Sequence, residues 1–299
     1  MRLQYRYAMR AFLAFFGLIF GSLVVGALVA YPAWLLLYPH FGFAFHRIAS
    51  RVGELVLLVG FLLIARRLGV SDRASLGYGL RRPLFLREMG KAIVVGAALM
   101  LPIVVFMGIL GLRQWSNGVA PDASQLTSLI VHGLITGLIV ALIEETFMRG
   151  AMYTAIERES GARAAIVLTA LVYSALHFFA RVRIAPEDVT WTSGFTLLAQ
   201  TLSAFASPLS IADAFLCLFG VGVLLGVVRR ATGNIAACIG LHAGWVWVLQ
   251  IAREGTDANR AHPASFLISN FDGLVGWLML AWTVLMGLGL YRYYARRRA

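Results

Sequence analysis

The stretch Ala141-Leu-Ile-Glu144-Glu145-Thr-Phe-Met-Arg149-Gly150 sets the organisation of this chain. It places two adjacent carboxylates and an arginine inside a helix that is otherwise apolar. One ionisable side chain in the middle of a bilayer costs about 2.5–3.5 kcal/mol on insertion scales. Three such groups within six positions therefore require a compensating role, either in the chemistry of the protein or in its structure.

The composition around this stretch is that of a membrane protein. Of the 299 residues, 60% are hydrophobic and only 13% are charged, with a mean hydropathy of +0.79, whereas soluble domains are about 25% charged. The formal net charge of +12 comes from arginines in short loops between apolar runs. This pattern indicates membrane topology rather than nucleic-acid binding. The two cysteines, Cys217 and Cys238, both fall in apolar runs and predict no disulfide framework.

Eight runs are long enough to cross a bilayer, since a spanning helix needs about 20 apolar residues. The fold class that we predict is all-α, a polytopic bundle of about eight transmembrane helices in one membrane domain, 1–299. If both termini are cytoplasmic, 18 of the 26 basic residues lie on the cytoplasmic side, as the positive-inside rule requires. The predicted spans are 11–37, 43–65, 91–112, 127–155, 163–180, 210–228, 233–252 and 271–292.

Three connecting segments have a distinct character. In 66–90, the apolar residues 84–86 lie among arginines, which predicts a short helix on the cytoplasmic leaflet. The segment 181–209 mixes charged and aromatic residues, so it either caps a cavity or rests at the interface. The segment 253–270 is polar and is predicted to be a solvent-facing connection.

Helical spacing separates the two carboxylates. Glu145 lies four residues before Arg149, the favourable order for an ion pair along a helix. Glu144 is rotated by about 100° and has only Phe147 and Met148 at its pairing positions. A like-charged neighbour and an apolar surround both oppose the ionisation of Glu144. A carboxyl group tuned in this way suits a general base at neutral pH.

Two histidines lie at comparable depth on other spans. His177 follows Tyr173 by one turn, and His242 lies between Gly240 and Gly244, which allow close helix packing. With Glu144, the two histidines could converge on one water, because hydrolysis needs a base for the water and donors for the oxyanion. The same three side chains are also a catalytic zinc set, although the His-Glu-x-x-His spacing of metalloproteases is absent.

Structural interpretations compete with these catalytic ones. Glu145 and Arg149 could serve as an intrahelical pair that only stabilises the bundle. Glu144 could be a protonated acid that bridges helices, and His177 and His242 could be interhelical hydrogen-bond donors.

These motifs resemble those of the CPBP family, which comprises CAAX prenyl endopeptidases and bacteriocin-processing and immunity proteins. The family pattern Glu-Glu-x-x-x-Arg is matched by Glu144, Glu145 and Arg149. The pattern Phe-x-x-x-His is matched at His177, with Tyr173 in the aromatic place. The resemblance covers about residues 125–250.

The last family pattern, His-x-x-x-Asn or His-x-x-x-Asp, is matched at His242 only, because Val246 occupies its fourth place. The resemblance implies an eight-helix intramembrane endopeptidase whose site opens toward the cytoplasmic half. It further implies that Glu144 and His177 activate water and that His242 donates to the oxyanion, with Glu145 and Arg149 in support. Val246 removes a donor from this oxyanion site, a change that typically reduces the rate 10²–10³-fold.

The function that we predict is hydrolysis of a peptide bond in a membrane-associated protein or peptide substrate. No cofactor is firmly implied; if zinc is used, Glu144, His177 and His242 are its ligands. The partners are this substrate and the lipid bilayer, without nucleic acid, in the cell membrane if the chain is bacterial. The main alternative is a non-catalytic membrane scaffold or immunity-type protein. A proton-coupled transporter is less favoured, because no paired repeat of interrupted helices is visible.

Overall fold

The computed structural model describes residues 9–178 and 183–296, and most of these residues are helical. Arg2, Arg6, Arg181, Arg297 and Arg298, which entered the charge count, lie outside the described residues, as does the end of the predicted span 163–180. The helices are α1 (Arg10–Phe41), α2 (Phe45–Arg67), α3 (Arg82–Ile109), α4 (Ala123–Glu145), a π-helix (Thr146–Met152), α5 (Tyr153–Leu176), α6 (Ser193–Leu202), α7 (Pro208–Thr232), α8 (Ala236–Gly255) and α9 (Trp277–Arg296). Short 3₁₀ turns occupy Ser116–Gly118, Pro186–Asp188, Ser203–Ala206 and Ser265–Leu267.

Each of the eight predicted spans overlaps one of these helices. The predicted break between 155 and 163 falls at Gly161, whose φ of 81° interrupts α5. Only glycine adopts this backbone conformation at little steric cost. By length and composition, five helical segments of the described chain are able to cross a membrane: α1, α2, α3, the continuous stretch Ala123–Leu176, and α7. The predicted fold class, a helical membrane bundle, is confirmed.

The segment 66–90 differs from its prediction. Residues 84–86 form no separate surface helix; they are the first turns of α3, which begins at Arg82 with a proline in its first turn. Proline is pre-organised for that position and starts a helix that then continues into the membrane span. The segment 181–209 contains α6, which packs against α1.

The segment 253–270 is more than a plain connection. It contributes strand β2 (Thr256–Ala258), which pairs antiparallel with β1 (Arg113–Trp115) in the register Arg113 to Ala258. The buried Arg113 side chain donates to the carbonyl oxygens of Gly273 at 2.8 Å and Ala252 at 3.2 Å. Arg113 thereby ties the ends of α3, α8 and the loop before α9 together, because each guanidinium donor needs a buried acceptor.

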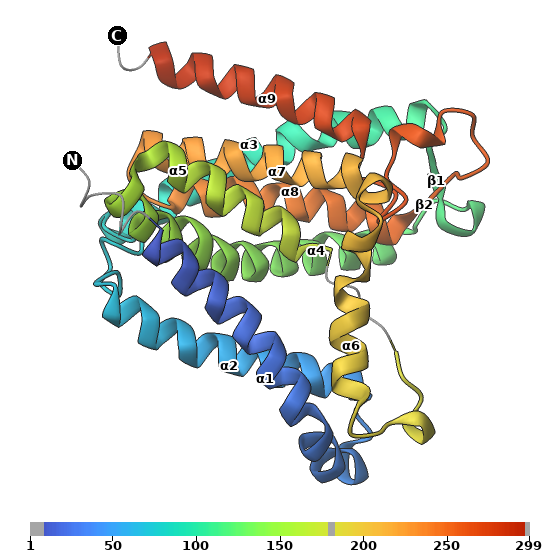
Figure 1. The fold of residues 1–299 in the computed structure, drawn as a ribbon. Coiled ribbons are helices and arrows are strands. Elements are labelled where there is room, and N and C mark those ends of the chain that lie inside the picture. The colour runs from blue at the N-terminus through green and yellow to red at the C-terminus, as the bar shows by residue number, and fades with distance from the viewer. Residues whose placement is uncertain (1–8, 179–182, 297–299) are drawn as a thin grey trace.

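The main body of the bundle is built around α8, which packs against α3 and α4 (Figure 1). The predicted close approach at Gly240 and Gly244 is confirmed, because a Cβ atom at either position would collide with the backbone of α3. On the other side, α5 packs against α7, and α7 against α9. The largest buried apolar cluster lies between these helices.

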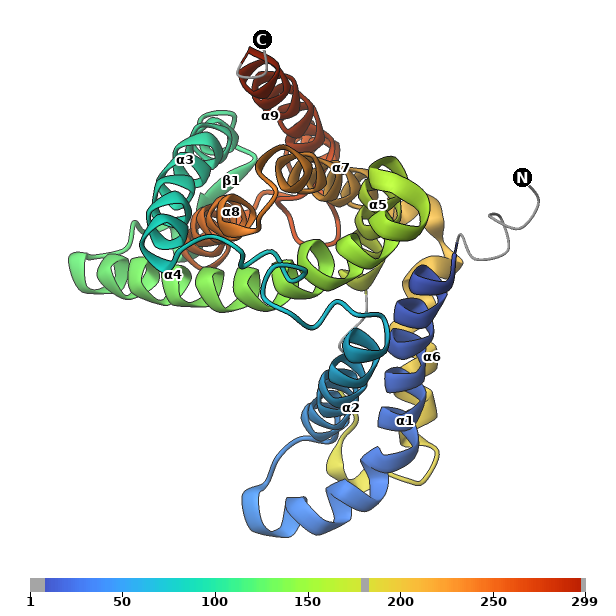
Figure 2. The same cartoon turned by 90° about the vertical axis from the view of Figure 1, so that its left-hand side faces the viewer.

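A second group of helices, α1, α2 and α6, projects away from this body (Figure 2). The two groups meet where Phe147 of the π-helix contacts Phe15 of α1 and Phe61 of α2, with ring centroids 5.5 and 5.3 Å apart. The projecting group is therefore packed against the main body at Phe147, three residues after Glu144 in the chain.

Candidate active site

The helix that carries the two glutamates changes its hydrogen-bonding pattern immediately after them. α4 is α-helical through Glu145, and Thr146–Met152 is a π-helix. A π-helix bonds residue i to residue i+5, is rare in proteins and occurs often at functional sites. The predicted regular α-helix through Arg149 is therefore wrong, although the Glu145–Arg149 pair forms despite the altered winding.

Glu145 is fully buried and joins two other elements of the site. Its Oε1 accepts hydrogen bonds from Nη1 of Arg149 at 3.0 Å and from Nδ1 of His242 at 2.8 Å. Arg149 is also fully buried. The prediction that Glu145 and Arg149 form an ion pair is confirmed, but the pair is not self-contained, because Glu145 also holds a histidine on α8.

The contact with Glu145 fixes the chemistry available to His242. A carboxylate oxygen accepts hydrogen bonds, so we assign the proton to Nδ1 of His242. The other ring nitrogen, Nε2, lies 4.0 Å from Oε2 of Glu144. This separation is too long for a direct hydrogen bond, and a water or a substrate atom could bridge it.

Glu144 differs from its neighbour in exposure. One third of its side chain is exposed, whereas that of Glu145 is sealed. No direct hydrogen bond of the Glu144 carboxylate is found within the described part of the chain, and the His242 ring, which is charged only when doubly protonated, lies 4.0 Å from it. The carboxylate that the spacing left unpaired is thus also the one that solvent or substrate can reach.

Tyr173 and His177 form the wall of the site that α5 supplies. The Tyr173 ring packs under the Arg149 guanidinium, 4.7 Å from its central carbon. The ring centroids of His177 and His242 lie 4.6 and 5.9 Å from that of Tyr173. The predicted convergence is therefore direct for His242, whereas His177 reaches the group through Tyr173.

His177 is half-buried at the end of α5. Its Nδ1 lies 2.8 Å from the carbonyl oxygen of Tyr173. A carbonyl oxygen only accepts, so Nδ1 carries a proton and Nε2 of the neutral ring is left as an acceptor. Within the described residues, His177 makes no hydrogen bond or ion pair with Glu144 or His242.

A buried arginine on α7 supports the π-helix and was not recognised from the sequence, which assigned it to the cytoplasmic charges. Nε of Arg229 donates to the carbonyl oxygen of Arg149 at 2.9 Å, and Nη2 donates to the Thr154 hydroxyl at 3.3 Å. The neighbouring Arg230 is exposed. Nothing in the sequence distinguishes these two adjacent arginines.

The loop 68–81, between α2 and α3, holds the same π-helix from the other side. The Tyr78 hydroxyl bonds to the Thr146 hydroxyl at 2.6 Å, and the Thr154 hydroxyl donates to the carbonyl oxygen of Ser75 at 2.7 Å. A Cβ atom on Gly150 would lie 2.8 Å from the carbonyl oxygen of Leu76, so the backbones touch there. The loop therefore acts as a strap across the segment that follows the glutamates.

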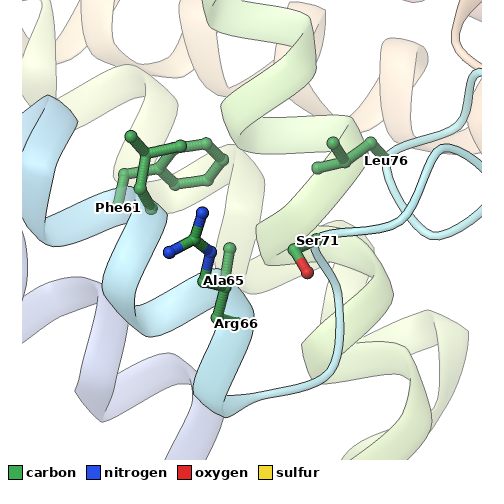
Figure 3. Close-up of a pocket in the computed structure, with 6 residues that line it drawn as sticks. Phe61, Ala65, Arg66, Ser71 and Leu76 are labelled. Atoms are coloured by element: carbon green, nitrogen blue, oxygen red, sulfur yellow. The ribbon is translucent and has the colours of Figure 1, made fainter.

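A pocket of about 290 Å³ opens between α2 and this strap (Figure 3). None of the predicted site residues lines it. Its lining is Phe61, Leu62, Ala65, Arg66, Ser71 and Leu76.

The zinc alternative does not fit the geometry of the described residues. Among them, no three His, Cys, Asp or Glu side chains are grouped closely enough to hold a metal ion. Glu144, His177 and His242 are therefore not arranged as a ligand set, and we derive no step through a metal.

The fold and this site define a class: a polytopic α-helical membrane protein with a buried glutamate–histidine–arginine cluster. Residues 126–248 match the family model for type II CAAX prenyl endopeptidase Rce1-like proteins. No curated protein and no solved structure matches the chain. The match to the family model supports the resemblance to the CPBP and CAAX-protease family, and all five predicted site residues lie within residues 126–248.

Proposed function

We propose that this chain hydrolyses a peptide bond of a membrane-associated protein or peptide with a water molecule that Glu144 and His177 activate. The observation that supports this proposal most strongly is the 4.0 Å separation between Oε2 of Glu144 and Nε2 of His242. The opposite ring nitrogen of His242, Nδ1, is hydrogen-bonded to Glu145. This separation leaves a carboxylate and an imidazole close together without a direct hydrogen bond, an arrangement that a bridging water in a hydrolytic site would fit.

In the reaction, Nε2 of His177 orients the water by accepting a hydrogen bond from it, and the Glu144 carboxylate takes a proton from the water while the water oxygen attacks the carbonyl carbon. The carbonyl electron pair moves onto oxygen, and His242 in its protonated form donates a hydrogen bond from Nε2 to this oxyanion. When the carbon–nitrogen bond breaks, the protonated Glu144 returns its proton to the leaving amine. Glu145 fixes the orientation and tautomer of His242, as the buried carboxylate does in a hydrolytic triad.

We further infer that α1 begins and α9 ends on the cytoplasmic side of the membrane. α1 begins and α9 ends at the same end of the bundle (Figure 1). The strap between α2 and α3, with Arg73 and Arg81, lies at that end as well, which supports a cytoplasmic location. The glutamates precede this end by the length of the π-helix and the first turns of α5, so substrate reaches them from the cytoplasmic half.

The proposal is tested by cleavage of a quenched-fluorescent reporter peptide in proteoliposomes. We expect Glu144→Gln and His242→Ala each to reduce turnover at least 100-fold. His132→Ala is the matched control, since His132 is an exposed histidine on α4 whose hydrogen bond within the described residues is to Ser128. Metal chelators are expected to leave the rate unchanged.

The rival function is a membrane scaffold or immunity-type protein that retains the polar cluster for structure. Val246 favours this rival, because it offers no polar atom in the place of the expected asparagine. Absence of turnover from the wild type would favour the scaffold, and turnover unaffected by both substitutions would exclude Glu144 and His242 as its source.

A further inference from the structure

The ring of Tyr173 lies between three groups of the candidate site. Arg149 covers one face, His177 packs against it from the same helix, and the His242 ring meets it edge-on. The residue is 4% exposed, so the position of the ring is fixed by packing on every side. Such a ring directs its hydroxyl group to one place.

The hydroxyl of Tyr173 makes no hydrogen bond to any residue that the structure describes. The hydroxyl groups of two other tyrosines do form hydrogen bonds: that of Tyr153 donates to Glu157 at 3.1 Å, and that of Tyr78 bonds to the Thr146 hydroxyl at 2.6 Å. Of these three described tyrosines, Tyr173 alone has a hydroxyl group available to another partner.

The residues around this ring are those of the candidate active site. Arg149, over one face of the ring, pairs with Glu145, and His242, at its edge, lies 4.0 Å from Glu144. Buried hydroxyl groups in native proteins nearly always have a partner. A hydroxyl held among these groups without one is placed to bind something that the protein itself does not supply.

We propose that the Tyr173 hydroxyl is a second oxyanion donor and replaces the polar side-chain donor that Val246 lacks. The proposal rests on the function proposed above. As water adds to the carbonyl carbon and its electron pair moves onto oxygen, Tyr173 donates a hydrogen bond to that oxygen and keeps its proton. No bond of the tyrosine forms or breaks, and Glu144 alone carries the transferred proton.

Two departures from the family pattern compensate each other if Tyr173 is an oxyanion donor. Val246 lies one turn after His242 on α8 and has no polar atom, so the donor of the usual asparagine is lost. Tyr173 stands where the pattern has phenylalanine, so one hydroxyl donor is gained, on the helix that faces His242. The number of oxyanion donors is therefore conserved.

The test is to remove and restore this donor. Tyr173→Phe deletes one oxygen atom and leaves the ring contacts in place. We expect kcat on the reporter peptide to fall 10²–10³-fold, the usual effect of losing one oxyanion donor, with KM changed less than threefold. Tyr153→Phe is the matched control, since it deletes the same atom outside the site, before the break in α5 at Gly161, and is expected to leave kcat unchanged.

Val246→Asn in the Tyr173→Phe background supplies the alternative donor and is expected to recover at least tenfold of the lost kcat. A purely structural role for the hydroxyl would not produce this rescue, which supports the donor role even if Tyr173→Phe lowers the yield of folded protein. If Tyr173→Phe keeps the wild-type kcat, the donor role is overturned while the protease function stands. If the wild type itself cleaves nothing and Glu144→Gln changes nothing, both proposals fall.

Discussion

The buried ion pair between Glu145 and Arg149 leads to a quantitative prediction about stability. Both side chains are fully buried. Glu145→Gln keeps the size of the side chain but removes the charge that compensates the guanidinium. Leaving one buried charge unpaired costs about 3–5 kcal/mol, so we expect the free energy of unfolding to fall by this amount. Arg149→Met should cost a similar amount, because it leaves the buried carboxylate without a guanidinium and with only its hydrogen bond to His242.

The double variant Glu145→Gln with Arg149→Met separates this charge effect from ordinary packing. The pair is incompletely satisfied, since Oε2 of Glu145 and Nε of Arg149 are sealed without partners within the described residues. Replacing a buried pair by neutral groups is often neutral or stabilising. We therefore expect the double variant to lie within about 1 kcal/mol of the wild type, with a coupling energy of at least about 3 kcal/mol.

The assay is unfolding by SDS in detergent micelles, followed by tryptophan fluorescence and circular dichroism for all four proteins. Activity supplies an independent readout, since the double variant should be stable yet slow: the carboxylate that holds His242 is gone. A coupling energy below about 1 kcal/mol, near the average for polar contacts between membrane helices, would refute the buried-charge reasoning.

Three further substitutions test the parts around the pair. Glu144→Gln should change the free energy of unfolding by less than about 1 kcal/mol, because its side chain is one-third exposed, while abolishing turnover; a large loss of stability would assign Glu144 a structural role instead. Arg229→Gln should lower the free energy of unfolding by about 1.5–3 kcal/mol, because charged hydrogen bonds are lost, and should increase hydrogen exchange in 146–154. The control is Arg230→Gln, at an exposed position; equal effects of the two substitutions would contradict the support assigned to Arg229. Gly150→Ala should lower the free energy of unfolding by about 1–3 kcal/mol in the same assay. The new methyl group would lie 2.8 Å from the carbonyl oxygen of Leu76, so the strap must shift. An unchanged unfolding midpoint would show that the strap is not packed tightly against Gly150.

Much of the fold followed from the amino-acid sequence because membrane helices are encoded locally. A run of about 20 apolar residues satisfies its own backbone hydrogen bonds, so every predicted span overlaps a helix. The break at Gly161 and the close packing at Gly240 and Gly244 also depend on local residue type. α6 and the β1–β2 pair were missed, since their short segments are defined by tertiary contacts.

The site was predictable only in part. Spacing was sufficient to pair Glu145 with Arg149 and to leave Glu144 open. Spacing says nothing about the hydrogen bond between Glu145 and His242, because 97 residues separate them in the chain. The π-helix and the different fates of Arg229 and Arg230 depend on how α7 and the strap pack, which no local pattern encodes.

The central claim is that Glu144 activates water for peptide hydrolysis. The most direct measurement compares turnover of a reporter peptide by wild-type protein and by Glu144→Gln, reconstituted in the same liposomes and matched for folded protein. We predict cleavage by the wild type that is insensitive to chelators, and a rate at least 100-fold lower for Glu144→Gln. Equal rates for the two proteins would contradict the account.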